Sequence, residues 1–84
     1  MEERRQGAHQ KALKSGRIVF NNRRSVVNCL IRNLSNGGAQ LRVESATDIP
    51  AEFTLMFDDG RPARDCVVKW RKLKDLGVAF KPGS

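Results

Sequence analysis

The feature that most constrains this chain is a series of short segments in which apolar and polar residues alternate. A period of two places alternate side chains on one face of a β-strand, whereas an amphipathic helix needs a period of about 3.6. Six such segments lie between Gly16 and Phe80, and none of them shows the helical period. The pattern therefore predicts an all-β domain of six strands.

Turn-forming residues separate these segments. Asn21–Ser25 supplies a turn because Asn tolerates a left-handed backbone, and Asn33–Gly38 is a polar break that contains glycine. Ser45–Ala51 is expected to be a loop that contains Pro50. Asp58–Pro62 places an Asp-Gly pair between two alternating segments, which is a hairpin signal. The two segments on either side of the Asp-Gly pair are therefore expected to form an antiparallel hairpin.

The length of 84 residues allows one domain and gives too little surface for two sheets to cover each other. Curling a single sheet into a barrel removes edge strands and encloses every second side chain. The side chains expected inside this barrel are the apolar ones that share a parity within each strand. They are Ile18, Phe20, Val27, Cys29, Ile31, Leu41, Val43, Phe53, Leu55, Phe57, Cys66, Val68, Trp70, Val78 and Phe80.

Residues 1–15 show neither period and are predicted to form a flexible basic arm in front of a single barrel domain over residues 16–84. The formal net charge is +7, and residues 1–32 hold eight Lys and Arg against Glu2 and Glu3. This asymmetry indicates an anionic partner, although a positive charge also keeps a small protein soluble. The chain has no apolar run that could span a membrane and no apolar signal segment, so a cytoplasmic protein without a membrane partner is expected.

Residues that could perform catalysis or bind a metal are sparse. The single histidine, His9, lies in the predicted arm, with nothing to hold it against a nucleophile. Cys29 and Cys66 are 37 positions apart and lack a CxxC spacing, so we expect reduced, buried thiols rather than zinc ligands. No glycine-rich phosphate motif is present. The sequence therefore predicts no enzyme, no metal site and no resident cofactor.

A nucleic-acid polymer is not an expected partner either. Small basic barrels bind single strands by stacking bases on exposed aromatic side chains. The chain has no Tyr, and its four Phe and Trp70 share the parity of the predicted interior. Binding to RNA would then be purely electrostatic. A basic RNA-binding barrel is the least favoured alternative.

Two features together could recognise a smaller anion. Arg4 and Arg5 lie in the arm, and a guanidinium can grip a phosphate or the O6/N7 edge of guanine with two parallel hydrogen bonds. Asn33, Ser35 and Gly38 form an Asn-x-Ser-x-x-Gly motif, in which Asn offers a donor and an acceptor to a purine edge. Glycine in the last position permits a positive φ and close approach of a ligand. Alone, this motif fits an ordinary turn, but with the arm it suits an anionic guanine nucleotide.

In these features the sequence resembles the PilZ domain, a bacterial receptor module for cyclic-di-GMP. Asn33–Gly38 matches the second motif of that family, and Trp70 with Gly77–Phe80 resembles its last two strands. The resemblance implies a six-stranded antiparallel Greek-key β-barrel whose arm closes on cyclic-di-GMP. Closure would change the surface seen by a downstream effector protein in motility, polysaccharide or biofilm control. The ligand-binding residues that it implies are Arg4, Arg5, His9, Asn33, Ser35 and Gly38.

The arm departs from the family's Arg-x-x-x-Arg signature at one position. Arg5 matches the first arginine and Arg4 extends the arm, but His9 stands where the second arginine belongs. Imidazole cannot form a two-pronged fork and is mostly neutral at neutral pH. Losing that contact should cost roughly 1.5–3 kcal/mol, or about ten- to a hundredfold in affinity. The alternative is a degenerate PilZ barrel that acts through protein contacts without binding the nucleotide.

Overall fold

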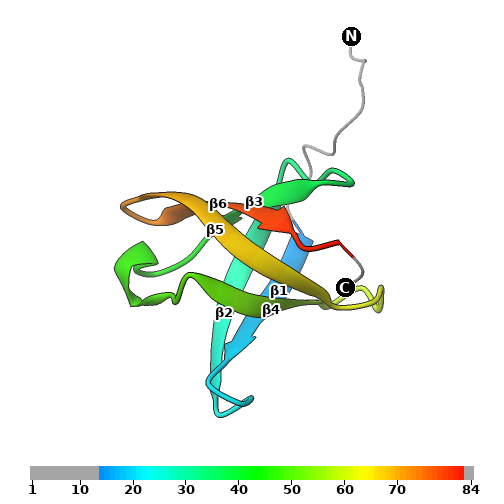
Figure 1. Ribbon diagram of the computed structural model, residues 1–84, viewed down its shortest axis with the longest axis horizontal. Helices are drawn as coiled ribbons and strands as arrows, with labels where there is room; N and C mark the ends of the chain where they lie inside the picture. The colour runs from blue at the N-terminus through cyan, green and yellow to red at the C-terminus, as the bar shows by residue number, and fades with distance from the viewer. Residues whose placement is uncertain (1–13, 83–84) are drawn as a thin grey trace, which may run out of the picture.

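A computed structural model describes residues 14–82 of the chain (Figure 1). It contains the six predicted strands, together with one short 3₁₀-helix inside the predicted loop at Ser45–Ala51. The first strand begins at Lys14, earlier than the predicted domain boundary at Gly16. The elements are β1 (Lys14–Phe20), β2 (Ser25–Arg32), β3 (Gly38–Arg42), η1 (Ala46–Asp48), β4 (Glu52–Phe57), β5 (Arg64–Lys72) and β6 (Asp75–Phe80).

The strands form a closed antiparallel barrel in the order β1-β2-β3-β6-β5-β4. β1 pairs with both β2 and β4, and β3 pairs with β6. β4, β5 and β6 are neighbours in chain order, and the longer connection that carries η1 joins β3 to β4. Because β3 lies beside β6 and not beside β4, the four strands β3, β4, β5 and β6 form a Greek key. The predicted fold class is confirmed. No helical segment among residues 14–82 is long and apolar enough to cross a membrane.

The interior of the barrel holds the apolar side chains that alternate along the strands. Ile18, Leu41, Leu55 and Cys66 are fully buried, as the parity of the sequence predicts. Four of the predicted residues are partly buried and pack against this core: Phe20, Val27, Val68 and Phe80. The core also includes apolar residues outside the predicted set, several of them in loops or at strand ends: Leu34, Ala39, Ala46, Ile49 and Leu76.

One predicted core residue, Trp70, lies outside the barrel. Val68 is opposite Val78 in the β5–β6 ladder, whereas Trp70 is opposite Gly77, so Lys69 is the extra residue of a β-bulge. An inserted residue reverses which side chains point inward beyond it. Trp70 is therefore 46% exposed on the outer face, and its predicted place in the interior is wrong.

Beyond the bulge, Arg71 is opposite the buried Leu76 and is itself exposed at the end of the barrel. Its Nη1 donates hydrogen bonds to the carbonyl oxygens of Ala46 at 2.6 Å and Ile49 at 2.5 Å. Buried carbonyl groups need such donors, because an unpaired polar group in the interior is costly. The guanidinium therefore fastens the η1 segment to β5 at one end of the barrel.

Left-handed backbone occurs mainly in the predicted turns. Asn21 and Asn22 both have φ of 56°, and Gly60 of the Asp-Gly hairpin has φ of 92°. Leu73, in the turn between β5 and β6, has φ of 51°, although leucine disfavours this region. Its carbonyl oxygen accepts a hydrogen bond from the backbone N–H of Ala46 at 3.0 Å. That bond ties the turn to the η1 segment.

Candidate functional site

The Asn-x-Ser-x-x-Gly motif forms the connection between β2 and β3. Asn33 follows the last residue of β2 and adopts a left-handed backbone with φ of 49°, which Asn tolerates better than most residues. Leu34 turns inward and is buried, with 8% of its surface exposed. Asn33 and Ser35, on either side of it, are exposed. The buried leucine therefore anchors the loop and presents both polar side chains outward.

Hydrogen bonds give the loop a defined shape. The backbone N–H of Ser35 donates to the carbonyl oxygen of Gly38 at 2.9 Å, and the Ser35 hydroxyl donates to the same oxygen at 3.2 Å. The carbonyl oxygen of Gly37 accepts from the backbone N–H of Phe80 at 2.9 Å. The serine hydroxyl keeps its lone pairs as acceptors. A ligand at this loop would therefore meet preorganised groups.

Gly38 serves the close packing of two strands rather than a special turn. Its φ does not lie in the left-handed region, so the expected use of a positive φ at this position is wrong. A Cβ on Gly38 would overlap the carbonyl oxygen of Val78 in β6. The last glycine of the motif is needed because β3 and β6 approach so closely here.

A shallow hollow of about 340 Å³ brings this motif together with β5 and β6. Asn33, Ser35 and Gly38 line one side of it. The bulge residues Lys69 and Trp70 line the other side. The remaining lining residues come from β3 and β6: Ala39, Gln40, Gly77 and Val78. The bulge therefore supplies an aromatic surface beside the three motif residues.

The hollow also contains hydrogen-bonding groups and positive charge. Asn33 Nδ2 donates to Gln40 Oε1 at 2.9 Å, which leaves the Asn33 carbonyl oxygen and the Gln40 amino group as an acceptor and a donor. Arg32 is opposite Gln40 in the β2–β3 ladder, so it lies beside the hollow. Within residues 14–82, neither Arg32 nor Lys69 forms an ion pair.

A second hollow of about 280 Å³ lies on the other side of Ser35. Ser35 and Asn36 line it together with two arginines that stack on aromatic rings. The Arg64 guanidinium lies 4.3 Å from the centre of the Phe80 ring, and that of Arg61 lies 5.4 Å from the centre of the Phe57 ring. Such stacking orients a guanidinium, and Arg61 is also paired with the Asp59 carboxylate through Nε and Nη2, each at 3.0 Å from Oδ2. The exposed loop is thus flanked by cations on both sides.

The arm residues Arg4, Arg5 and His9 lie outside the described residues, so their positions relative to the motif are not part of the structure. The first described residue, Lys14, is opposite Ile31 in the β1–β2 ladder, two positions before Asn33. Its Nζ is 3.8 Å from Asp59 Oδ2. A backbone hydrogen bond from Arg61 holds the pKa of Asp59 below its ordinary value. The described chain therefore begins at the end of the barrel that carries the motif.

Sequence reasoning found the motif but missed the aromatic and cationic residues around it. Strict alternation places Trp70 inside the barrel, and the bulge that turns it outward has no clear signature in the residues around it. Lys69 could be recognised only as an outward residue of a strand. Gln40 was visible only as an outward residue of a strand. Arg61 and Arg64 lie at and just after the Asp-Gly hairpin signal, and that signal predicts a turn but gives no indication of a binding site.

The two cysteines do not take part in this site. Both are free and buried, and burial raises the pKa of each thiol from 9.0 to about 12. A neutral thiol in an apolar interior is a poor nucleophile and a poor metal ligand. Among residues 14–82, no group of three or more His, Cys, Asp or Glu side chains is arranged to hold a metal ion.

Comparison with known proteins agrees with this arrangement. The profile of the PilZ domain family matches residues 2–84, which is nearly the whole chain. No match was found among curated proteins or among solved structures. The matched region spans the complete barrel and the motif at the β2–β3 connection. The chain therefore belongs to the PilZ domain family.

Proposed function

We propose that this PilZ domain is a receptor for cyclic-di-GMP that binds the nucleotide at the hollow between the β2–β3 loop and the bulge of β5. The observation that carries the proposal is the meeting of Asn33, Ser35 and Gly38 with Trp70 and Lys69 around one hollow. The family is one of cyclic-di-GMP receptors, and three of these residues form its second motif. Binding would change the surface offered to a downstream effector protein.

The chemistry of the hollow suits a guanine base and its phosphate. The open carbonyl oxygen of Asn33 can accept from the N1–H and amino groups of guanine, and the Gln40 amino group can donate to O6 or N7. The Trp70 indole offers a flat surface for stacking, which is worth about 1–3 kcal/mol per base. Lys69 and Arg32 supply positive charge for the phosphates.

The arm can reach the hollow from its point of attachment. Arg5 precedes Lys14 by nine residues, and an extended chain of that length spans roughly 30 Å. Because Lys14 lies opposite Ile31, the arm joins the barrel near the end of β2 from which the loop emerges. Arg4 and Arg5 can therefore serve as the bidentate clamp, with His9 as the weaker third contact.

The direct test is calorimetric titration of the full chain with cyclic-di-GMP. We expect saturable binding, and we expect Arg5→Ala and Asn33→Gly each to lower the affinity about tenfold or more. Glycine at position 33 removes the amide while keeping the left-handed backbone possible. Lys72→Ala, in a residue outside the hollow, is the matched control and should bind like the parent.

His9 allows a second measurement of the same site. If the imidazole contacts a phosphate, binding should strengthen as the pH falls from 8 to 6, because the charged form gains population near its ordinary pKa of about 6.5. His9→Arg should tighten binding and remove this pH dependence. Absence of heat and of amide shifts at Asn33 and Ser35 at high micromolar nucleotide would reject the receptor function and leave the degenerate barrel that acts through protein contacts.

A further inference from the structure

The barrel leaves half of β2 without a neighbour on one side. β1 pairs with β2 over Ser25–Ile31, but β3 pairs only with Leu30, Ile31 and Arg32. Among the described residues, Ser25–Cys29 therefore have no strand partner on the side that faces away from β1. In an antiparallel strand, the N–H and C=O groups of alternate residues point to the same side. Part of the backbone of this segment thus offers an unused row of hydrogen-bonding groups.

This edge lacks the features that normally protect a free strand. Natural proteins protect exposed edges with charged residues, prolines or β-bulges that prevent another chain from pairing there. The segment Ser-Val-Val-Asn-Cys contains no charge and no proline, and its ladder with β1 runs without a bulge. An unprotected edge in a protein of this size is either an aggregation hazard or a place for a partner.

Half-exposed apolar side chains lie on both faces of the same segment. Val26, on the outer face, is 54% exposed. Val27, on the inner face, packs against the core together with Phe20 from the adjacent strand, and both are only partly buried. An added strand places its side chains beside those of its neighbour on both faces. It would therefore cover Val26 with one set of side chains and Val27 with the other.

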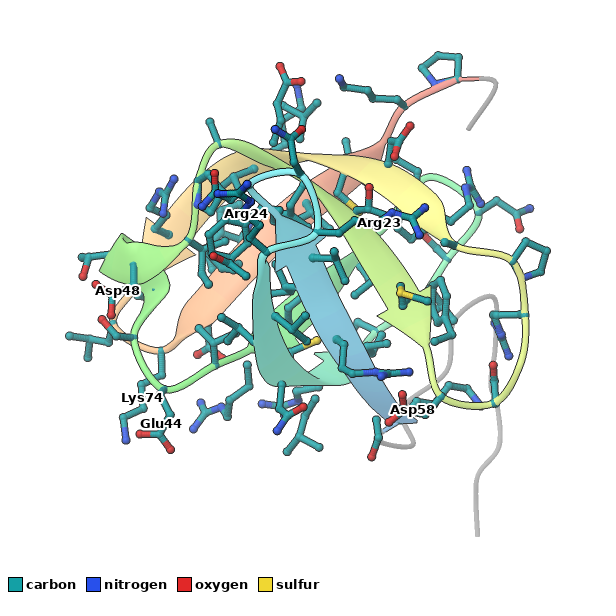
Figure 2. The ribbon with its side chains drawn as sticks, turned by 90° about the horizontal axis from the view of Figure 1, so that it is seen from below. Arg23, Arg24, Glu44, Asp48, Asp58 and Lys74 are labelled. Carbon is teal, nitrogen blue, oxygen red and sulfur yellow. The ribbon has the colours of Figure 1, made fainter. Side chains whose placement is uncertain are left out.

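Positive charge is concentrated at one end of the edge. Arg23 and Arg24 form part of the β1–β2 turn next to Ser25, as Figure 2 shows, and neither makes an ion pair within residues 14–82. Elsewhere in the same view, Lys74 and Glu44 lie next to each other (Figure 2). A segment that pairs with the edge would gain from carrying acidic residues at this end.

We propose that Ser25–Cys29 is a docking edge that adds an extended peptide segment of a partner protein as a further strand. The partner segment has β-branched residues on both faces, which cover Val26 and Val27, and it carries acidic residues where it meets Arg23 and Arg24. A second copy of this chain is a poorer occupant, because each copy has a formal net charge of +7. Main-chain pairing supplies affinity and the alternate side chains supply specificity in this mode of recognition.

The docking edge and the nucleotide site lie at opposite ends of β2. Asn33 follows Arg32 at one end, and Arg24 precedes Ser25 at the other. Cys29, the near end of the docking edge, precedes Asn33 by four residues, or roughly 13 Å of strand, and the arginines of the turn lie farther away. Docking at the edge can therefore be measured without nucleotide, and its failure would leave the proposed receptor function untouched.

The test uses the full chain and a fluorescein-labelled synthetic peptide, Glu-Asp-Val-Thr-Val-Thr-Val. We expect saturable fluorescence anisotropy and slower amide hydrogen exchange within Ser25–Cys29 on binding. The same peptide N-methylated at alternate residues, which removes the pairing donors on one side, should not bind. Arg24→Glu should lower the affinity about tenfold, whereas Lys14→Glu, with the same change of charge at the far end of β1, should not.

Three results would overturn the proposal. Equal binding of the N-methylated peptide would show that main-chain pairing is not used. Protection or amide shifts confined to other strands would place the peptide elsewhere. A concentration-dependent dimer in sedimentation equilibrium, with protection of Ser25–Cys29 in the absence of peptide, would assign the edge to a second copy of the chain.

Discussion

The indole of Trp70 lies against the backbone of Gly77 so closely that a Cβ at that glycine would overlap Nε1. Gly77→Ala should therefore push the indole away from β6 and out of the hollow. The cost in stability should be small, about 1 kcal/mol, because the ring is already half exposed and can swing outward. We expect a change in tryptophan fluorescence and weaker nucleotide binding. Unchanged fluorescence, with Gly37→Ala as the control in open space, would contradict this prediction.

Gly38→Ala should act on the barrel itself. The added Cβ would meet the carbonyl oxygen of Val78, and backbone atoms cannot move aside as a surface side chain can. We expect the free energy of unfolding, measured by urea denaturation, to fall by about 2–3 kcal/mol. Gly37→Ala should cost much less, since nothing lies near that position. Equal effects of the two substitutions would show that β3 and β6 adapt to the added methyl group.

Leu73 offers the opposite opportunity, a substitution that should stabilise the protein. Its backbone has φ of 51°, and its side chain is 88% exposed, so strain is present without compensating burial. Leu73→Asn should raise the free energy of unfolding by about 1 kcal/mol, because Asn tolerates the left-handed region better. Thermal denaturation would measure the change. Lys74→Asn, at the neighbouring position without a positive φ, should show no comparable gain.

The buried thiols should make stability depend on alkaline pH. Burial raises the pKa of Cys29 and Cys66 from 9.0 to about 12, so the folded protein keeps both thiols neutral where the unfolded chain ionises them. Their contribution is fully present below about pH 9 and is lost as the pH rises towards 12. Urea denaturation between pH 8 and 11 should show a steeper fall than in the double variant Cys29→Ala/Cys66→Ala. Parallel curves for the two proteins would contradict the shift.

Much of the fold follows from alternation along the sequence, because residues such as Ile18, Leu41 and Leu55 face inward wherever a strand is regular. Alternation fails where the chain departs from a regular strand. Leu34 and Ile49 lie in loops, which carry no period, yet both reach the core. Trp70 is displaced by the bulge, whose position depends on how β5 pairs with β6 and not on local residue types.

The candidate site was predictable to the extent that it is carried by a short motif. Asn33 and Ser35 lie within one loop, so their spacing alone places them together on the surface. The residues that complete the hollow come from β5 and β6, about 35 positions later in the chain, and only the barrel register brings them near. The register between strands that are distant in the sequence cannot be predicted from alternation within each strand.

The extra residue at Lys69 sets the orientation of both residues that follow it. Removing it would turn the tryptophan ring towards the apolar interior and move the Arg71 guanidinium away from the carbonyl oxygens of Ala46 and Ile49 in a single step. The Arg71 hydrogen bonds that hold η1 and the Trp70 ring that lines the hollow thus both depend on the same bulge. A point substitution at Trp70 or at Arg71 removes one of these features and leaves the other intact, whereas deletion of one residue abolishes both.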